Sequence, residues 1–182
     1  MTKVPKFFNT AGPIQQDIHY NVDSLKRINL DEIMDLIDQR KYFILHAPRQ
    51  TGKTSCLLAL RDYLNAQSDY IAVYANVEAG QAARNNVEEV IRSTIGTIAE
   101  RTGTVLGNDV AWDIYDELCR RNGQINSLLT SFLKRLSETL PRPLVLFIDE
   151  IDALVGDSLV SVLRQIRAGY DQRPQHFPIS TA

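Results

Sequence analysis

Short apolar segments alternate with stretches of helical periodicity along the chain, and this alternation limits the possible fold more than any other feature. The apolar segments span residues 41–47, 70–77 and 144–148. They are short and rich in β-branched and aromatic residues, which is typical of buried strands. Strands that alternate with helices predict an α/β fold in which a mostly parallel sheet carries helices on both faces.

Capping residues and helix breakers place the helices between these strands. Asn29 is expected to cap the first helix, and Pro141 and Pro143 end the helix before the third strand. The predicted helices cover residues 30–39, 55–64, 80–101, 111–121 and 125–136, with a loop at residues 102–109. Asp157 or Ser158 is expected to cap a last helix that runs through residue 169, with Leu163 among its inward-facing side chains.

Composition fits a single cytoplasmic domain of ordinary size. The chain has 182 residues, of which 44 % are hydrophobic, enough for a packed core, and its formal net charge is −2. This balance gives no global attraction to nucleic acid or to an anionic membrane. No segment has the length of a membrane span or of a signal peptide core. Cys56 and Cys119 are expected to be free thiols. We expect an irregular N-terminal segment at residues 1–22 and one domain over residues 23–182.

A candidate phosphate loop, residues 47–55, lies between the first strand and the helix that follows. Within HAPRQTGKTS, residues 47–54 fit the pattern small-x-x-x-x-Gly-Lys-Ser/Thr. Gly52 lets the backbone approach phosphate oxygens, Lys53 offers a positive charge to the β and γ phosphates during binding and catalysis, and the Thr54 hydroxyl is a ligand for Mg²⁺. The first position is Ala47 rather than glycine, so the turn must form without a left-handed residue there. The predicted ATP-binding residues are Ala47, Pro48, Arg49, Gln50, Thr51, Gly52, Lys53, Thr54 and Ser55.

Two carboxylates follow the third strand in the sequence LVLFIDEID. Asp149 stands at the tip of the strand, where it is expected to hold the Mg²⁺ shell. Glu150 follows directly, and we expect it to act as the general base that polarises an attacking water. Asp152 is expected to cap a helix or to face solvent. The two motifs together predict Mg²⁺-dependent ATP hydrolysis.

These motifs resemble those of P-loop ATPases of the AAA type. The blocks KYFILHAPRQTGKT, NVEAGQAAR and LRQIRAGYDQRP further resemble prokaryotic AAA-like ATPases of ill-defined role, and together the blocks run through most of the chain. The resemblance implies a three-layer αβα P-loop NTPase fold, ATP and Mg²⁺ as ligands, and sites that commonly lie at contacts in a homo-oligomer. It also implies a strand between the phosphate-loop strand and the acidic strand. Residues 179–182 offer a stub for that strand, so we expect a truncated form that lacks C-terminal strands.

Three functions stay open on the sequence. The first is an ATPase, and the second is a nucleotide-responsive module that binds a protein or DNA partner with little turnover. The third is an inactive, truncated remnant. Arg164, Arg167 and Arg173 follow the acidic motif, but none of them is assigned as an arginine finger. No membrane partner is expected.

Overall fold

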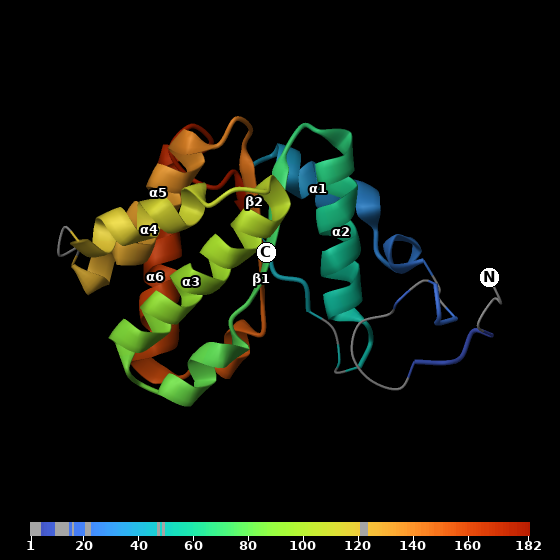
Figure 1. Ribbon diagram of the computed structural model, residues 1–182. Coiled ribbons are helices and arrows are strands. Elements are labelled where there is room, and N and C mark those ends of the chain that lie inside the picture. The colour runs from blue at the N-terminus through green and yellow to red at the C-terminus, as the bar shows by residue number, and fades with distance from the viewer. Residues whose placement is uncertain are drawn as a thin grey trace.

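A computed structural model describes residues 5–9, 15, 17–20, 23–46, 48, 50–120 and 124–182. Helices form two groups on either side of a small sheet (Figure 1). The α-helices and strands are α1 (Leu30–Asp38), α2 (Lys53–Gln67), β1 (Ile71–Asn76), α3 (Val87–Leu106), α4 (Val110–Arg120), α5 (Ile125–Thr139), β2 (Leu144–Asp149), α6 (Gly156–Ala168) and β3 (Ser180–Thr181). The 3-10 helices are η1 (Ser24–Arg27), η2 (Glu78–Ala83), η3 (Ile151–Ala153) and η4 (Tyr170–Gln172).

The sheet is parallel, with the strand order β1-β2-β3. β1 and β2 pair along their whole length, from Ile71 opposite Leu144 to Asn76 opposite Asp149. The carboxyl ends of both strands therefore finish at the same edge of the sheet. This confirms the predicted α/β class and the parallel pairing of the second and third predicted strands.

The predicted strand at residues 41–47 is wrong for the residues that the structure describes there. Only Tyr42 forms a bridge, parallel to Thr181, and the Phe43 N–H donates to the Thr181 carbonyl over 3.1 Å. Residues 43–46 have no regular structure, and Ile44 is 89 % exposed. The segment has too short a strand to pair with, because β3 is two residues long and offers no further backbone groups.

β3 lies between β2 and the segment around Tyr42. Its residues pair with Val145 and Leu146 on one side, and Thr181 pairs with Tyr42 on the other. The expected stub at residues 179–182 therefore separates the acidic strand from the segment that precedes the candidate phosphate loop. Asp149 stands on the strand that is next but one to that segment.

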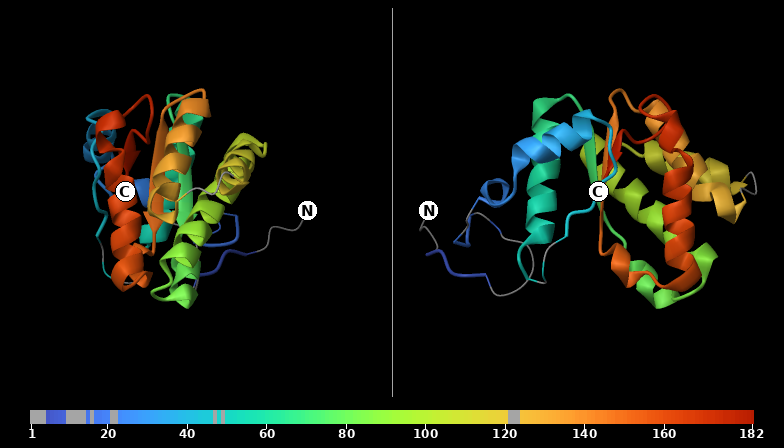
Figure 2. Two further views of the ribbon diagram at one scale, coloured as in Figure 1. Left: turned by 90° about the vertical axis from the view of Figure 1, so that its left-hand side faces the viewer. Right: turned by 180° about the vertical axis from the view of Figure 1, so that it is seen from behind.

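Alternate side chains of β1 and β2 belong to two separate cores. Ala72, Tyr74, Val145 and Phe147 pack with helices α1 and α2, whose buried side chains include Leu60. The opposite face packs with α3, α5 and α6 through Ile71, Val73, Ala75, Leu144, Leu146 and Ile148. Figure 2 shows the sheet between these two groups of helices. Helices thus cover both faces of the sheet, as the alternation predicts.

Several helix boundaries differ from the predictions because asparagines cap them. The stretch after Gly80 is not one helix, since η2 ends at Ala83 and Asn86 caps α3 by accepting from the Glu89 N–H. The predicted loop at residues 102–109 is wrong for residues 102–106, because α3 continues to Leu106. Residues 107–109 do connect α3 to α4, and Gly107 is the C-cap residue of α3.

The last helix also departs from expectation at its start and on its buried face. α6 starts at Gly156, and Asn85 from a distant part of the chain accepts from the Asp157 N–H over 2.8 Å. Leu163 is 48 % exposed. Gln165 is buried on this helix instead. Its side-chain oxygen accepts from the Leu129 N–H over 2.8 Å, and its side-chain nitrogen donates to the Ile125 carbonyl over 3.0 Å.

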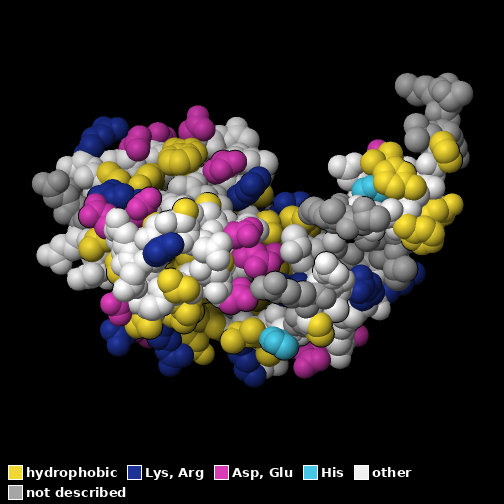
Figure 3. Space-filling model, turned by 90° about the horizontal axis from the view of Figure 1, so that it is seen from below, with side chains coloured by type: hydrophobic (Ala, Val, Ile, Leu, Met, Phe, Trp, Pro, Cys, Tyr) yellow, Lys and Arg dark blue, Asp and Glu magenta, His cyan; other side chains and the backbone are white. Residues whose placement is uncertain are grey.

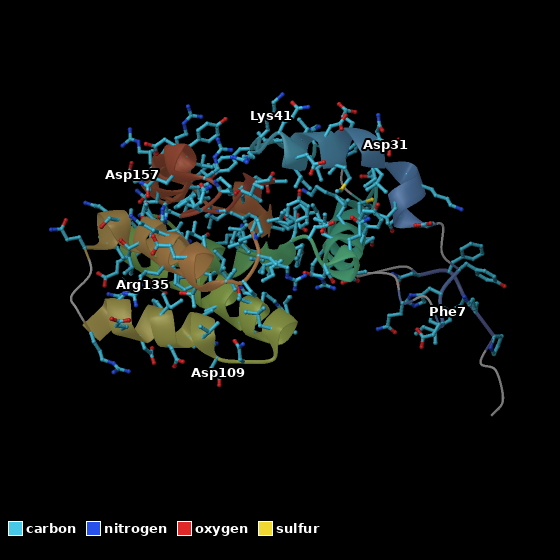
Figure 4. The ribbon with its side chains drawn as sticks, turned by 90° about the horizontal axis from the view of Figure 1, so that it is seen from above. Phe7, Asp31, Lys41, Asp109, Arg135 and Asp157 are labelled. Carbon is cyan, nitrogen blue, oxygen red and sulfur yellow. The ribbon has the colours of Figure 1, made fainter. Side chains whose placement is uncertain are left out.

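Aromatic side chains gather in the described part of the N-terminal segment. Phe7 forms a bridge with His19, and the ring centroids of Phe8 and Tyr20 lie 4.9 Å apart. Phe7 lies apart from the helical body when the molecule is viewed from the end at which the strands begin (Figure 4). In the same view Arg135 of α5 points toward α4, where Glu117 accepts from it over 2.5 Å.

No helix in the described part of the chain has both the length and the apolar character needed to cross a membrane. Cys56 and Cys119 are free thiols, as predicted.

Candidate functional site

The candidate phosphate loop joins the segment after Tyr42 to the start of α2. Its described residues are Pro48 and residues 50–55, and the predicted positions Ala47 and Arg49 lie outside the described residues. Gln50 and Gly52 have φ angles of 61° and 84°, in the left-handed region, and the Thr51 hydroxyl donates to the Pro48 carbonyl over 2.7 Å. Such alternation in backbone handedness turns neighbouring N–H groups toward one side of a loop.

Helix α2 presents its amino end at this loop without a side-chain cap. Gly52 is the N-cap residue, and the first backbone bond runs from the Cys56 N–H to the Gly52 carbonyl over 3.0 Å. The first N–H groups of a helix have no acceptor within it, and the helix dipole makes this end positive. The amides around Lys53, Thr54 and Ser55 therefore favour a negative group at this position.

Asp149 is the centre of the site, because four groups from three segments converge on its carboxylate. Its Oδ2 accepts from the Thr54 hydroxyl over 2.7 Å and from the Tyr74 hydroxyl over 3.0 Å. Its Oδ1 accepts from the Glu150 N–H over 3.1 Å and lies 3.6 Å from Lys53 Nζ. The Asp149 side chain is 1 % exposed, whereas that of Lys53 is 32 % exposed. A carboxylate this deeply buried needs such donors in place of water.

The strand register explains why these side chains meet. Asp149 is opposite Asn76, and it follows Val145 and Phe147 on the face that packs against α2. Tyr74 lies on the same face of β1, two residues before Asn76 and opposite Phe147. The end of β2 thus carries Asp149 to the start of α2, where Lys53 and Thr54 lie.

Glu150 turns away from the strand in a conformation that is unusual for its residue type. Its φ of 58° and ψ of 34° are left-handed, and its carbonyl accepts from the Ala153 N–H over 3.0 Å. The side chain is half-buried, and the described residues include no hydrogen-bond or ion-pair partner for its carboxylate. Non-glycine residues in this region cluster at functional sites. The role of Glu150 as a general base stays a prediction.

Arg27 and Tyr74 belong to the site but were missed from the sequence. The Arg27 guanidinium donates through Nη2 to the Thr51 carbonyl, inside the candidate phosphate loop. Nothing in the pattern around Arg27 indicates this contact, because it lies on η1, before α1. The sequence predicts Tyr74 as a core residue of a strand. Only its position on the same face of the sheet as Asp149 indicates that it contacts the site.

Acidic side chains gather in the middle of the molecular face at which the strands end (Figure 3). Glu78, Glu150 and Asp152 belong to the segments that follow β1 and β2 at this edge, and Asp152 is exposed. Carboxylates in this position disfavour a bare triphosphate and favour one that carries a cation.

Arg167 and Arg173 pack on Tyr170 rather than at the site. The Arg173 guanidinium carbon lies 3.4 Å from the centroid of the Tyr170 ring and 5.0 Å from that of Tyr42. Arg167 lies 4.7 Å from the Tyr170 ring centroid. Lys41, next to Tyr42, lies at the outer edge of the molecule when it is viewed from the end at which the strands begin (Figure 4). Both guanidinium groups are held in cation–π contacts there.

A model of the family described as Nephrocystin 3, N-terminal matches residues 25–179. The match spans the candidate phosphate loop, β1, β2 and Asp149, and covers well over half of the 182 residues. Neither the curated proteins nor the solved structures include a match. The narrower resemblance to AAA-type ATPases is not tested by this match and stays a prediction. On the extent of the match, the chain belongs to the nephrocystin 3 N-terminal family.

Proposed function

We propose that the chain binds ATP with Mg²⁺ at the candidate phosphate loop and hydrolyses it with Glu150 as the general base. The observation that carries this proposal is the hydrogen bond of 2.7 Å between Thr54 and Asp149, which are 95 positions apart in the sequence. Two motifs with separate predicted roles in holding a metal thus meet at one point. Two motifs with unrelated roles would have no reason to be in contact across 95 positions of the chain.

The donor set at this point suits Mg²⁺. The Thr54 hydroxyl and the Asp149 carboxylate are oxygen donors, which Mg²⁺ prefers. The described residues hold no group of three or more His, Cys, Asp and Glu side chains that could bind a metal by themselves. Most ligands of the ion would therefore be phosphate and water oxygens, as is usual for Mg²⁺ in nucleotide sites. Bound Mg²⁺ would neutralise charge that develops on the phosphates.

Each residue of the site has a part in the proposed reaction. Lys53 exchanges the Asp149 carboxylate for a phosphate oxygen, and its exposure of 32 % leaves it free to move toward solvent. Thr54 would offer a lone pair of its hydroxyl oxygen to the metal, while its hydrogen still bonds Asp149. The amides at the start of α2 hold phosphate oxygens. Glu150, whose carboxylate has no partner among the described residues, takes a proton from the attacking water.

The resemblance to AAA-type ATPases supports a finer version of this proposal, in which the fold is a P-loop NTPase fold. The position of β3 between β2 and Tyr42 agrees with the strand order that the resemblance implies. In this version a homo-oligomer supplies an arginine to the site from a neighbouring copy.

A nucleotide-responsive binding module with slow turnover is the second candidate. It is favoured by the contacts of Arg167 and Arg173, whose guanidinium groups pack on Tyr170 instead of facing the candidate phosphate loop. An arginine that stabilises the transition state contributes about 10³–10⁵ to the rate in related chemistry. A chain without one would bind ATP and hydrolyse it slowly.

Binding is tested by titrating the chain with a fluorescent ATP analogue, with Mg²⁺ and with EDTA. We expect saturable binding in Mg²⁺ that weakens strongly in EDTA and is lost in Lys53→Ala. Lys134→Ala, which removes an exposed lysine of α5, is the matched control and should bind like the wild type. Equal affinity in Lys53→Ala and Lys134→Ala would exclude the candidate phosphate loop as the binding site.

Turnover is tested by phosphate release under saturating Mg²⁺ and ATP. Glu150→Gln should keep nucleotide affinity and lose about 100-fold or more in rate, because general-base catalysis contributes about 10²–10⁴. Asp113→Asn, which changes an exposed carboxylate of α4, should release phosphate at the wild-type rate. Tight binding with equal background release in wild type and Glu150→Gln would favour the slow module over the ATPase.

A further inference from the structure

Tyr74 places a hydroxyl group beneath the carboxylate at the centre of the site. It lies on β1, its side chain is 8 % exposed, and its hydroxyl donates to Asp149 Oδ2 over 3.0 Å. The same oxygen accepts from Thr54 over 2.7 Å. The phenol ring packs in the core between the sheet and α2. A phenylalanine would fill nearly the same volume, so core packing alone does not account for the hydroxyl group.

The Tyr74 hydroxyl donates to one oxygen of Asp149 from a ring that is fixed in the core between the sheet and α2. A fixed neutral donor against one carboxylate oxygen limits how that carboxylate can rotate.

The two donors on Oδ2 differ in what metal binding would require of them. Thr54 has one hydroxyl hydrogen, which it donates to Asp149. As a metal ligand it would offer a lone pair of the same oxygen to the ion while its hydrogen still bonds Asp149. Tyr74 lies on β1, the strand that pairs with the strand of Asp149, and its ring is fixed in the core. Of the two donors on Oδ2, it is the one that would not itself bind the ion.

We propose that Tyr74 is a positioning residue that holds the Asp149 carboxylate in the orientation needed for Mg²⁺, acting through Asp149 and touching neither metal nor nucleotide. This inference rests on the proposed function, because it assumes that Asp149 serves a metal. Groups that orient a metal ligand in this way are typically responsible for about 10–100-fold in metal affinity.

The test measures the Mg²⁺ dependence of ATP binding in Tyr74→Phe. The fluorescent ATP analogue is titrated at a series of Mg²⁺ concentrations and in EDTA. We expect the Mg²⁺ concentration at half-maximal binding to rise about 10-fold or more, while affinity in EDTA stays at the wild-type value. A purely structural defect would lower binding in both conditions alike.

Tyr70→Phe is the matched control. The Tyr70 hydroxyl also donates to a carboxylate, Asp38 Oδ1 over 2.6 Å, but it precedes β1 at the opposite end of the strand from the site. This variant removes a tyrosine–carboxylate bond and should leave the Mg²⁺ midpoint unchanged. A Mg²⁺ midpoint in Tyr74→Phe equal to that of the wild type would overturn the proposal.

A double-mutant cycle with Asp149→Asn gives a second test that does not depend on the stability of one variant. If Tyr74 acts through the carboxylate, Tyr74→Phe should change the Mg²⁺ midpoint of the wild type but not that of Asp149→Asn. Equal shifts in both backgrounds would contradict this mechanism. Failure of the wild type to bind the analogue at all would refute the proposed function instead, so the two failures are distinguishable.

Discussion

Gly52→Ala should destabilise the protein for two separable reasons, which can be weighed from the geometry at the start of α2. Gly52 has a φ of 84°, in the left-handed region where a side chain costs about 1–2 kcal/mol. A Cβ at this position would also lie 2.8 Å from Nη1 of Arg27. The Arg27 guanidinium is the end of a flexible side chain, so this group would move and the backbone would not. It would then lose its hydrogen bond to the Thr51 carbonyl.

The expected loss in the free energy of unfolding is the sum of these effects. The displaced hydrogen bond is worth about 0.5–1.5 kcal/mol, so Gly52→Ala should cost about 1.5–3.5 kcal/mol in total. Gly107→Ala is the matched control, because Gly107 has a φ of 69° and its Cβ would meet nothing within 4 Å. Both changes restrict the unfolded chain equally, so that contribution cancels in the comparison.

Urea unfolding followed by circular dichroism measures these costs in the two variants and in each combined with Arg27→Ala. Gly52→Ala should cost more than Gly107→Ala, and the excess should disappear once Arg27 is an alanine. An excess that persists without Arg27, or a cost no larger than that of Gly107→Ala, would refute the contact between Arg27 and the loop as its cause.

Two further predictions concern β1 and the segment around Tyr42. Asn65→Ala should lower the free energy of unfolding, measured by urea unfolding, by about 1–3 kcal/mol, because it leaves the buried Ala72 N–H and carbonyl without the Asn65 amide. Asn65→Asp keeps only the acceptor, so its stability should fall between those of the wild type and Asn65→Ala. No loss of stability in Asn65→Ala would show that water replaces the amide. Burial raises the pKa of Tyr42 to about 12, so the folded chain holds this proton more tightly than the unfolded chain. Stability should therefore be unaffected below about pH 10 and decline as the pH rises toward 12, and the decline should be smaller in Tyr42→Phe when unfolding is measured from pH 9 to 11; identical profiles would contradict the pKa assignment.

The meeting of Thr54 and Asp149 could be predicted because parallel strands end at one edge of a sheet. Once the candidate phosphate loop is placed before a helix and Asp149 at the end of a parallel strand, the fold class brings them to the same edge of the sheet, although residues 43–46 form no strand. The continuous apolar runs of β1 and β2 are strong signals for buried strands, and both strands were predicted correctly.

Pairing and side-chain capping are harder to predict because they depend on distant residues. Apolar composition at residues 41–47 indicates burial, yet a strand also needs a partner, and β3 offers only two residues. Asn85 caps α6 from 72 positions away, a contact without a local signal. Gln165 is polar but buried, because the amino-terminal part of α5 supplies partners for its amide.

The same logic explains why Tyr74 escaped prediction. Its ring belongs to the core, and only the hydroxyl at its tip reaches the site. A tyrosine in an apolar strand is consistent with plain packing, so its contact with Asp149 becomes visible only when the strand register is known.

The amide of Asn65 acts as a substitute for a neighbouring strand at the outer side of β1. It offers the donor and the acceptor that another backbone would present to Ala72. Any chain that tried to extend the sheet in this direction, whether in an aggregate or in an assembly, would first have to displace the amide. Growth of the sheet past β1 is therefore disfavoured by a single side chain that imitates the peptide group.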